Sequence, residues 1–189
     1  GLAIVTAWTW RRRAVGARAH VHRLERELQG LQGTFSRFLP ARVVDRIITA
    51  RGDLPAERKQ ATILFADIAG FTAMSERTDP AEIVEILNGY FERMSRTIAA
   101  HEGHVAKFIG DGLMATFGAV SDDPWQIRDA VQAALGMREA LAEYNSELSA
   151  KGTSGLRIGI GIHHGAAIAG LVGSEEVREF TVIGDVVNT

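Results

Sequence analysis

Two short segments, each carrying one aspartate behind an apolar run, constrain this chain more than any other feature. The first is Phe65 to Thr72, FADIAGFT, and the second is Lys107 to Gly112, KFIGDG. In each segment the aspartate, Asp67 or Asp111, enters a turn that contains glycine. Two carboxylates at strand ends, beside a turn with free backbone N–H groups, form a site for divalent metal and polyphosphate. Taken singly, either aspartate is more often a turn residue or a helix cap.

The pattern of apolar residues from 59 to 189 predicts an α+β fold around these segments. Strands are predicted at 61–66, 104–109, 113–117, 156–162 and 179–183. A helix is predicted after Asp79, and its apolar stripe comprises Ile83, Ile86, Leu87, Tyr90, Phe91, Met94 and Ile98. A second follows Pro124, with the stripe Ile127, Val131, Ala134, Met137, Leu141, Tyr144 and Leu148. The order β-α-β-β-α-β is that of the ferredoxin-like fold, which places the first strand beside the central hairpin.

The residues before this domain predict a membrane attachment and a signalling helix. Residues 1–13 are apolar up to two tryptophans and three arginines, which predicts the cytoplasmic end of a transmembrane helix. A signal-peptide remnant and the start of a buried helix are the alternatives. Residues 14–39 carry apolar residues at alternating spacings of three and four, which favours a parallel coiled coil over an amphipathic helix packed on its own domain. Residues 40–58 predict a short helix and a linker.

The distribution of charge separates the two parts of the chain. Residues 1–58 carry eleven arginines against five acidic residues, whereas residues 59–189 carry ten basic against eighteen acidic residues. The basic arginines lie beside an apolar start and lack interleaved aromatic residues, so a membrane surface is expected and nucleic acid is not. The absence of cysteine excludes disulfides and thiolate metal sites, and it is compatible with a domain that lies in the cytoplasm at the cell membrane.

Three segments of the domain resemble a known family. FADIAGFT, KFIGDG and FTVIGDVVN at Phe180 to Asn188 are similar, in order and spacing, to the signature segments of class III adenylyl and guanylyl cyclase domains. The resemblance covers roughly residues 58–189, with the domain incomplete at its C-terminal end. It implies that Asp67 and Asp111 bind metal, together with the backbone carbonyl of Ile68. It also implies a turn that cradles the triphosphate, formed by Ile68, Ala69, Gly70, Phe71 and Thr72.

The same resemblance implies how the nucleotide base and ribose are recognised. Lys107 matches the lysine that reads the base in adenylyl cyclases, Thr181 matches its partner, and Asn188 matches the asparagine that orients the ribose. A lysine donor suits the N1 acceptor of adenine, and Thr181 can accept from N6, whereas guanine offers a donor at N1 and an acceptor at O6. Mismatched buried donors can discriminate by up to roughly 10⁴. ATP is therefore the expected substrate, and a guanylyl cyclase is the alternative.

The implied reaction is attack of the ribose 3′-oxygen on the α-phosphorus, which gives 3′,5′-cyclic AMP and pyrophosphate with two Mg²⁺ or Mn²⁺ ions. In this family the site lies between two catalytic domains, so a homodimer with two sites is expected, oriented by the coiled coil. The family places a transition-state arginine shortly after the asparagine, beyond Thr189, so the 189-residue chain is expected to be nearly inactive. A silent membrane-tethered dimerisation or nucleotide-sensing module is the alternative from another class.

Overall fold

The computed structural model describes residues 43–44, 48–49, 55–174 and 178–187. The chain divides into two compact units, Gly1–Asp45 and Arg46–Thr189, and all the strands belong to the second. The predicted membrane segment and coiled coil, residues 1–39, lie outside the described residues. Within the described ranges, every helix is too short or too polar to span a lipid bilayer.

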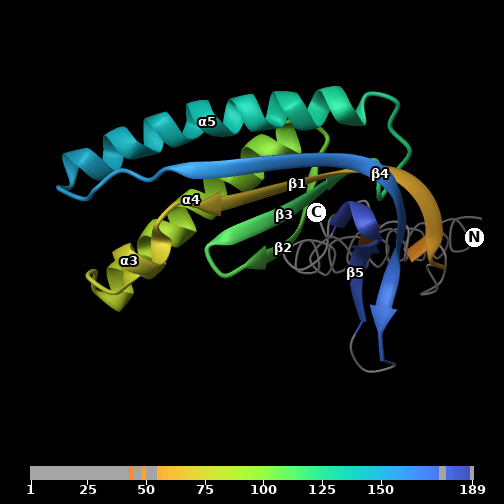
Figure 1. The fold of residues 1–189 in the computed structure, drawn as a ribbon, viewed down its shortest axis with the longest axis horizontal. Helices are drawn as coiled ribbons and strands as arrows, with labels where there is room; N and C mark the ends of the chain where they lie inside the picture. The colour runs from red at the N-terminus through yellow and green to blue at the C-terminus, as the bar shows by residue number, and fades with distance from the viewer. Residues whose placement is uncertain (1–42, 45–47, 50–54, 175–177, 188–189) are drawn as a thin grey trace, which may run out of the picture. The chain divides into compact units, whose positions relative to one another are not determined.

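A five-stranded sheet in the order β2-β3-β1-β4-β5 is the framework of the second unit (Figure 1). Each neighbouring pair of strands is antiparallel. The strands are β1 (Glu57–Ile68), β2 (His104–Ile109), β3 (Gly112–Phe117), β4 (Ile158–Gly173) and β5 (Arg178–Ile183). The predicted ferredoxin-like order is confirmed, and β1 lies beside the β2–β3 hairpin as expected.

Two long helices, α4 (Pro80–Ala100) and α5 (Gln126–Ala150), pack together against one face of this sheet. Asp79 caps α4 as predicted, because its carboxylate accepts a hydrogen bond from the Ala81 N–H at 2.9 Å and Pro80 occupies the first turn. The buried residues of α4 all belong to its predicted stripe: Ile86, Tyr90, Met94 and Ile98. They form one core with Leu64, Ala66 and Ile68 of β1.

The predicted stripe of α5 is wrong at its first two positions, Ile127 and Val131, whereas its third residue, Ala134, is partly buried against the core. Ile127 and Val131 are 50% and 44% exposed, whereas Ala130 and Ala133 are fully buried. The prediction is confirmed only for the second half, where Met137, Leu141, Tyr144 and Leu148 are buried. The buried apolar residues of the first half are thus alanines, whose small side chains let the helix lie close to its neighbours.

Two strands are longer than predicted, and one short helix was not predicted. β1 begins at Glu57 rather than at residue 61, because its first residues pair with β4 from Ala169 onward. β4 continues to Gly173, well past the predicted end at residue 162, and Figure 1 shows it bending sharply along its length. A short helix, α3 (Phe71–Ser75), follows β1 where only a turn was expected.

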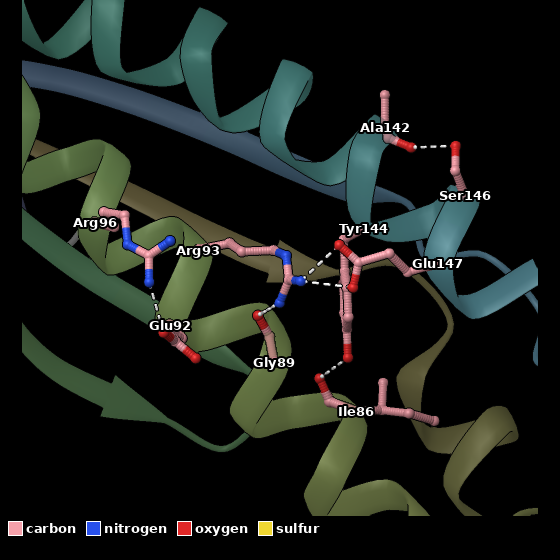
Figure 2. Close-up of polar contacts among 9 residues, drawn as sticks. All are labelled: Ile86, Gly89, Glu92, Arg93, Arg96, Ala142, Tyr144, Ser146 and Glu147. Atoms are coloured by element: carbon pink, nitrogen blue, oxygen red, sulfur yellow. Dashed lines mark hydrogen bonds and ion pairs between the residues drawn. The ribbon is translucent and has the colours of Figure 1, made fainter. Parts of the chain in front are cut away.

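The contact between α4 and α5 is fixed by polar groups as well as by the core (Figure 2). Arg93 of α4 donates to both carboxylate oxygens of Glu147 at 2.8 and 2.6 Å and to the Gly89 carbonyl at 3.0 Å. Its guanidinium lies over the Tyr144 ring, 4.3 Å from the centroid. The Tyr144 hydroxyl in turn donates to the Ile86 carbonyl at 3.0 Å. These contacts hold the helical layer that supports the sheet.

Candidate active site

The first predicted aspartate lies at the end of β1, on the face of the sheet that the helices leave uncovered. Leu64, Ala66 and Ile68 point into the core beneath α4 and α5. Successive side chains of a strand point to opposite faces, so Phe65 and Asp67 point away from the helices. Asp67 is therefore the last side chain that β1 presents on its open face.

The second predicted aspartate lies in the tight turn between β2 and β3. Gly110 and Asp111 form this turn, and Gly110 has a φ of 61°, a conformation that glycine adopts without strain. β3 then runs beside β1, with Leu113 paired to Ala66. The turn consequently brings Asp111 to the same end of the sheet as Asp67, as the sequence predicts.

The two carboxylates interact directly. Loss of hydration raises the pKa of Asp67, as do the negative charge of Asp111 and a hydrogen bond with it, while a hydrogen bond from the Ile68 N–H lowers it. Gly112 makes room for this arrangement, since a Cβ there would lie 3.0 Å from Asp67 Oδ1 and 3.0 Å from the Ala66 carbonyl oxygen. The hairpin thus approaches Asp67 closely because residue 112 has no side chain.

This pair fits a divalent cation on the chemistry of its donors. Two carboxylates in contact repel one another, and a hard cation between them would remove that repulsion. No group of three or more His, Cys, Asp or Glu side chains in the described part of the chain could hold a metal ion. Side-chain ligation would therefore rest on Asp67 and Asp111, with the remaining ligands drawn from backbone carbonyls such as that of Ile68, from water or from phosphate oxygens.

The predicted phosphate-binding turn, Ile68 to Thr72, leads from β1 into α3. Gly70 caps α3 with a φ of 78°. The Ala69 N–H donates to the Arg157 carbonyl at 2.8 Å, so this group is already engaged within the chain. The first four N–H groups of a helix have no carbonyl partner within it, and here three of them, those of Gly70, Phe71 and Thr72, belong to the predicted turn. The part of the turn with donors suited to phosphate is therefore its second half.

Lys107 lies on the same open face as Asp67. It pairs with Met114 of β3, which pairs in turn with Phe65 of β1, and directly opposed residues share one face of a sheet. Its ammonium group forms an ion pair with Glu179 of β5, with Nζ 3.3 Å from Oε1. Because β2 and β5 are the two edge strands, this contact shows that the bend in β4 carries β5 back toward β2.

Thr181 and Asn188 are the other two residues that the sequence predicts to recognise the nucleotide. Thr181 lies in β5 opposite Gly170 of β4, and it is partly exposed. It is two residues from Glu179, so both side chains project from one face of β5. The structure thus brings the strand of Thr181 to Lys107. Asn188 lies outside the described residues.

Two glycines of β4 leave the open face bare beside the carboxylates. Gly159 lies opposite Asp67, and Gly161 lies opposite Phe65. A Cβ at either glycine would meet nothing within 4 Å. Glycines in a strand allow another backbone or a ligand to approach closely, and this bare surface leaves room for such an approach.

Sequence reasoning missed two residues near the predicted site. The Tyr90 hydroxyl is buried and has no hydrogen-bond partner among the described residues. Burial, then the charges of Asp67 and Asp111, raise the pKa of Tyr90 far above its usual value. Glu179 is the second, and its contact with Lys107 crosses the width of the sheet. Tyr90 was expected only as part of a core stripe, and no spacing in the sequence relates Glu179 to Lys107.

Comparisons with known proteins agree with this fold and with the resemblance to the cyclase family. The family model for the adenylate and guanylate cyclase catalytic domain matches residues 55–189. Adenylate cyclase 1 of Rhizobium meliloti (strain 1021) is 36% identical over 157 residues, which cover 82% of this chain and 24% of the relative. The chain thus spans about a quarter of the length of that relative.

Solved structures of both cyclase types are similar to the chain. The guanylyl cyclase Cya2 is 38% identical with a TM-score of 0.68, over 70% of this chain and 68% of that one. The adenylyl cyclase CyaB from P. aeruginosa is 33% identical with a TM-score of 0.68, over 71% of this chain and 70% of that one. With its paired aspartates and its strand order, the chain belongs to the adenylate and guanylate cyclase catalytic domain family.

Proposed function

We propose that the domain is an adenylate cyclase, which converts ATP to 3′,5′-cyclic AMP and pyrophosphate. The observation that carries this proposal is the approach of Asp111 to Asp67, which lies on the same open face of the sheet as Lys107. Similarity to the adenylate cyclase of Rhizobium meliloti and to the adenylyl cyclase CyaB supports the same substrate.

In this proposal Asp67, Asp111 and the Ile68 carbonyl hold two Mg²⁺ or Mn²⁺ ions. When bound, such ions lower the pKa of a coordinated hydroxyl and neutralise charge that develops on phosphate oxygens. The N–H groups of Gly70, Phe71 and Thr72 orient the triphosphate, as donors at a helix start suit anionic oxygens. No side chain acts as a nucleophile, because the 3′-oxygen of the substrate is the attacking atom.

Base selection depends on the direction of hydrogen bonding. Lys107 can only donate, which suits the N1 acceptor of adenine, and the Thr181 hydroxyl can accept from the N6 amino group. Guanine has a donor at N1 and an acceptor at O6, so it would place a donor against Lys107 and an acceptor where Thr181 is proposed to accept. GTP is the second candidate substrate because the chain is similar to the guanylyl cyclase Cya2. The hydrogen-bonding groups of Lys107 and Thr181 disfavour GTP.

The proposed assembly is a homodimer in which one chain supplies the metal-binding aspartates and the other supplies Lys107, Thr181 and Asn188. A surface left bare by Gly159 and Gly161 beside Asp67 supports the close approach of a ligand or a second chain. Residues 1–13 would attach the protein to the cell membrane with the catalytic domain in the cytoplasm. Residues 14–39 would form the coiled coil that orients the two domains.

The test is a product assay on the full-length protein. ATP or GTP is supplied with Mn²⁺ or with Mg²⁺, and the cyclic products are separated and quantified. We expect cyclic AMP from ATP and at most a small yield of cyclic GMP. Asp67→Asn and Asp111→Asn should each reduce the rate by at least about 10³-fold, since each removes a charged metal ligand.

The matched control is Glu92→Gln, which also replaces a carboxylate by an amide. Glu92 is exposed on α4, and within the described part of the chain its ion pair is with Arg96 of the same helix, at 2.6 Å. This variant should keep the wild-type rate. Cyclic GMP as the main product would establish the guanylyl cyclase instead. No product from either nucleotide would favour the silent dimerisation or nucleotide-sensing module.

A further inference from the structure

We propose that Glu179 is a positioning residue for Lys107, which holds the lysine in the orientation that reads adenine. This inference rests on the proposed function, since it assigns a role at the same base-reading site. None of the three signature segments includes Glu179, which directly precedes the third of them.

The ion pair itself is the first line of support. Lys107 Nζ lies 3.3 Å from Glu179 Oε1, and the two side chains are 35% and 56% exposed. The residues come from β2 and β5, which are separated in the sheet by three other strands. The contact exists only because the second half of β4 bends and carries β5 with it (Figure 1). It is therefore a tertiary contact rather than a pairing of neighbouring residues on one element.

The position of Glu179 within β5 is the second line of support. Phe180 and Val182 are buried, whereas Glu179 and Thr181 project from the other face of the strand. Glu179 and Thr181 are thus adjacent side chains on one face, about 7 Å apart along the strand. The ion pair holds the Lys107 ammonium group at this face of β5. The Glu179 carboxylate therefore keeps Lys107 beside Thr181, its proposed partner in base recognition.

The chemistry of lysine explains why such an anchor is useful. A lysine side chain has a long flexible stem and three N–H donors on its ammonium group. The ion pair with Glu179 restricts the stem and leaves N–H donors of the ammonium group for the base. Without the anchor, Lys107 would have to lose this freedom when the nucleotide binds, and binding would weaken accordingly.

This role predicts a specific kinetic signature. Base recognition is remote from the α-phosphorus, so loss of the anchor should raise KM for ATP more than it lowers kcat. It should also narrow the preference for ATP over GTP, because a mobile ammonium group no longer imposes its donor on the N1 position. A role confined to folding would change the amount of active enzyme and would leave this preference unchanged.

The experiment compares Glu179→Ala and Glu179→Gln in the full-length protein, each also in the Lys107→Ala background. We expect Glu179→Ala to lower kcat/KM for ATP by about three- to tenfold, the effect of freeing one restrained side chain. The ratio of kcat/KM for ATP to that for GTP should fall by a similar factor. Glu179→Gln should recover most of the loss, since an amide oxygen still accepts from Lys107.

The double variants isolate the path through Lys107. In the Lys107→Ala background, Glu179→Ala should change kcat/KM for ATP by less than about twofold, as a residue that acts only through Lys107 must. The matched control is Glu139→Ala, because Glu139 is exposed on α5. An unchanged nucleotide preference in Glu179→Ala, or an equal loss with and without Lys107, would overturn the inference.

A binding measurement separates this inference from the proposed function. Calorimetric titration with α,β-methylene-ATP and α,β-methylene-GTP reports base selection without any turnover. A protein that makes no cyclic product, yet loses its preference for the ATP analogue in Glu179→Ala, would refute the proposed function and retain the role of Glu179. An active adenylate cyclase whose preference for the ATP analogue is unchanged in Glu179→Ala would support the proposed function and refute the role of Glu179. A protein that forms no cyclic product and shows no preference for the ATP analogue would refute both.

Discussion

The lack of a side chain at Gly112 lets the Asp67 carboxylate lie close to the β2–β3 hairpin. A methyl group there would lie 3.0 Å from both Asp67 Oδ1 and the Ala66 carbonyl oxygen, so Gly112→Ala must displace the carboxylate, the strand or both. We expect a loss of cyclase rate of about ten- to a hundredfold, the effect of a small misplacement of a catalytic group. The Mn²⁺ concentration for half-maximal rate should rise. Steady-state assays with a Mn²⁺ titration measure both.

The fold should tolerate the same change. The free energy of unfolding of Gly112→Ala, from urea denaturation, should fall by no more than about 1–3 kcal/mol, as for other overpacked sites. Wild-type rate and wild-type Mn²⁺ dependence in this variant would show that the Asp67 carboxylate does not need its present position over Gly112.

Tyr90 offers a test of how polar groups are satisfied beneath the aspartates. Its hydroxyl is buried without a hydrogen-bond partner among the described residues, and an unsatisfied buried hydroxyl costs about 1–3 kcal/mol. Tyr90→Phe should therefore leave the free energy of unfolding unchanged or increase it. Urea denaturation measures the change.

Tyr144→Phe is the matched control, because the Tyr144 hydroxyl donates to the Ile86 carbonyl at 3.0 Å. This variant should lose about 0.5–1.5 kcal/mol, the usual contribution of one hydrogen bond. If Tyr90→Phe destabilised the protein as much as Tyr144→Phe does, the Tyr90 hydroxyl would have a partner in the folded protein.

Individual site residues differ in how far the sequence predicts them. Asp67 and Asp111 can be found because each follows an apolar strand and stands in or beside a glycine turn, features that are local in the chain. Their contact follows from the strand order, which the sequence also predicts. Glu179 cannot be found in this way, because its approach to Lys107 depends on the bend of β4. The engagement of the Ala69 N–H by Arg157 is equally invisible, since it joins distant segments.

At the scale of the elements, apolar periodicity predicts where helices lie better than which face they bury. The stripe of α4 is confirmed because its large apolar residues also face the core. In α5 the large residues Ile127 and Val131 are exposed, and Ala130 and Ala133 are buried instead. Close contact between neighbouring elements requires small residues. Gly136 of α5 is another example, since a Cβ there would lie 2.9 Å from Thr97 Cγ2 of α4. A hydrophobicity pattern gives such residues little weight.

The packing of α4 on α5 makes a prediction at Gly89. A Cβ there would lie 2.4 Å from the Tyr144 hydroxyl oxygen and 2.7 Å from its Cζ. Alanine gains up to about 1 kcal/mol over glycine in a helix, but overpacking costs about 1–3 kcal/mol. Displacement of the ring would also break its bond to the Ile86 carbonyl (Figure 2). We therefore expect Gly89→Ala to lower the free energy of unfolding by about 1–2 kcal/mol.

A double-mutant cycle identifies the cause. In the Tyr144→Leu background the clash with the ring is absent, so Gly89→Ala should become neutral or stabilising. Urea denaturation of the four proteins gives the coupling energy. An equal loss from Gly89→Ala in both backgrounds would show that Tyr144 is not what opposes a side chain at this position.

At the scale of the whole molecule, the strand order is predictable and the curvature of the sheet is not. The order follows from the succession of strands and helices and from short connections, both of which the sequence displays. The added length of β1 and β4 comes from their mutual pairing, which includes Glu57 with Ala169. Glycines and alanines dominate the second half of β4, so neither alternation nor β-propensity marks it as a strand.

The proposed active site is divided between two chains. In it, Asp67 and Asp111 would form the metal-binding half, and Lys107 with its β5 neighbours would form the base-reading half. If each chain of a homodimer contributes one half to each site, then a chain defective in either half can still complete a site with a partner defective in the other. Neither defective chain can do so with a copy of itself.

The most direct measurement is therefore the cyclic AMP rate of an equal mixture of Asp67→Asn and Lys107→Ala full-length proteins, unfolded and refolded together. At an ATP concentration well below KM, Asp67→Asn alone should be nearly inactive and Lys107→Ala alone should keep only a small residual rate. The mixture should recover about one quarter of the wild-type rate, since about half of the dimers are mixed and each of these holds one intact site. A mixture that forms mixed dimers but stays as inactive as its components would contradict the account.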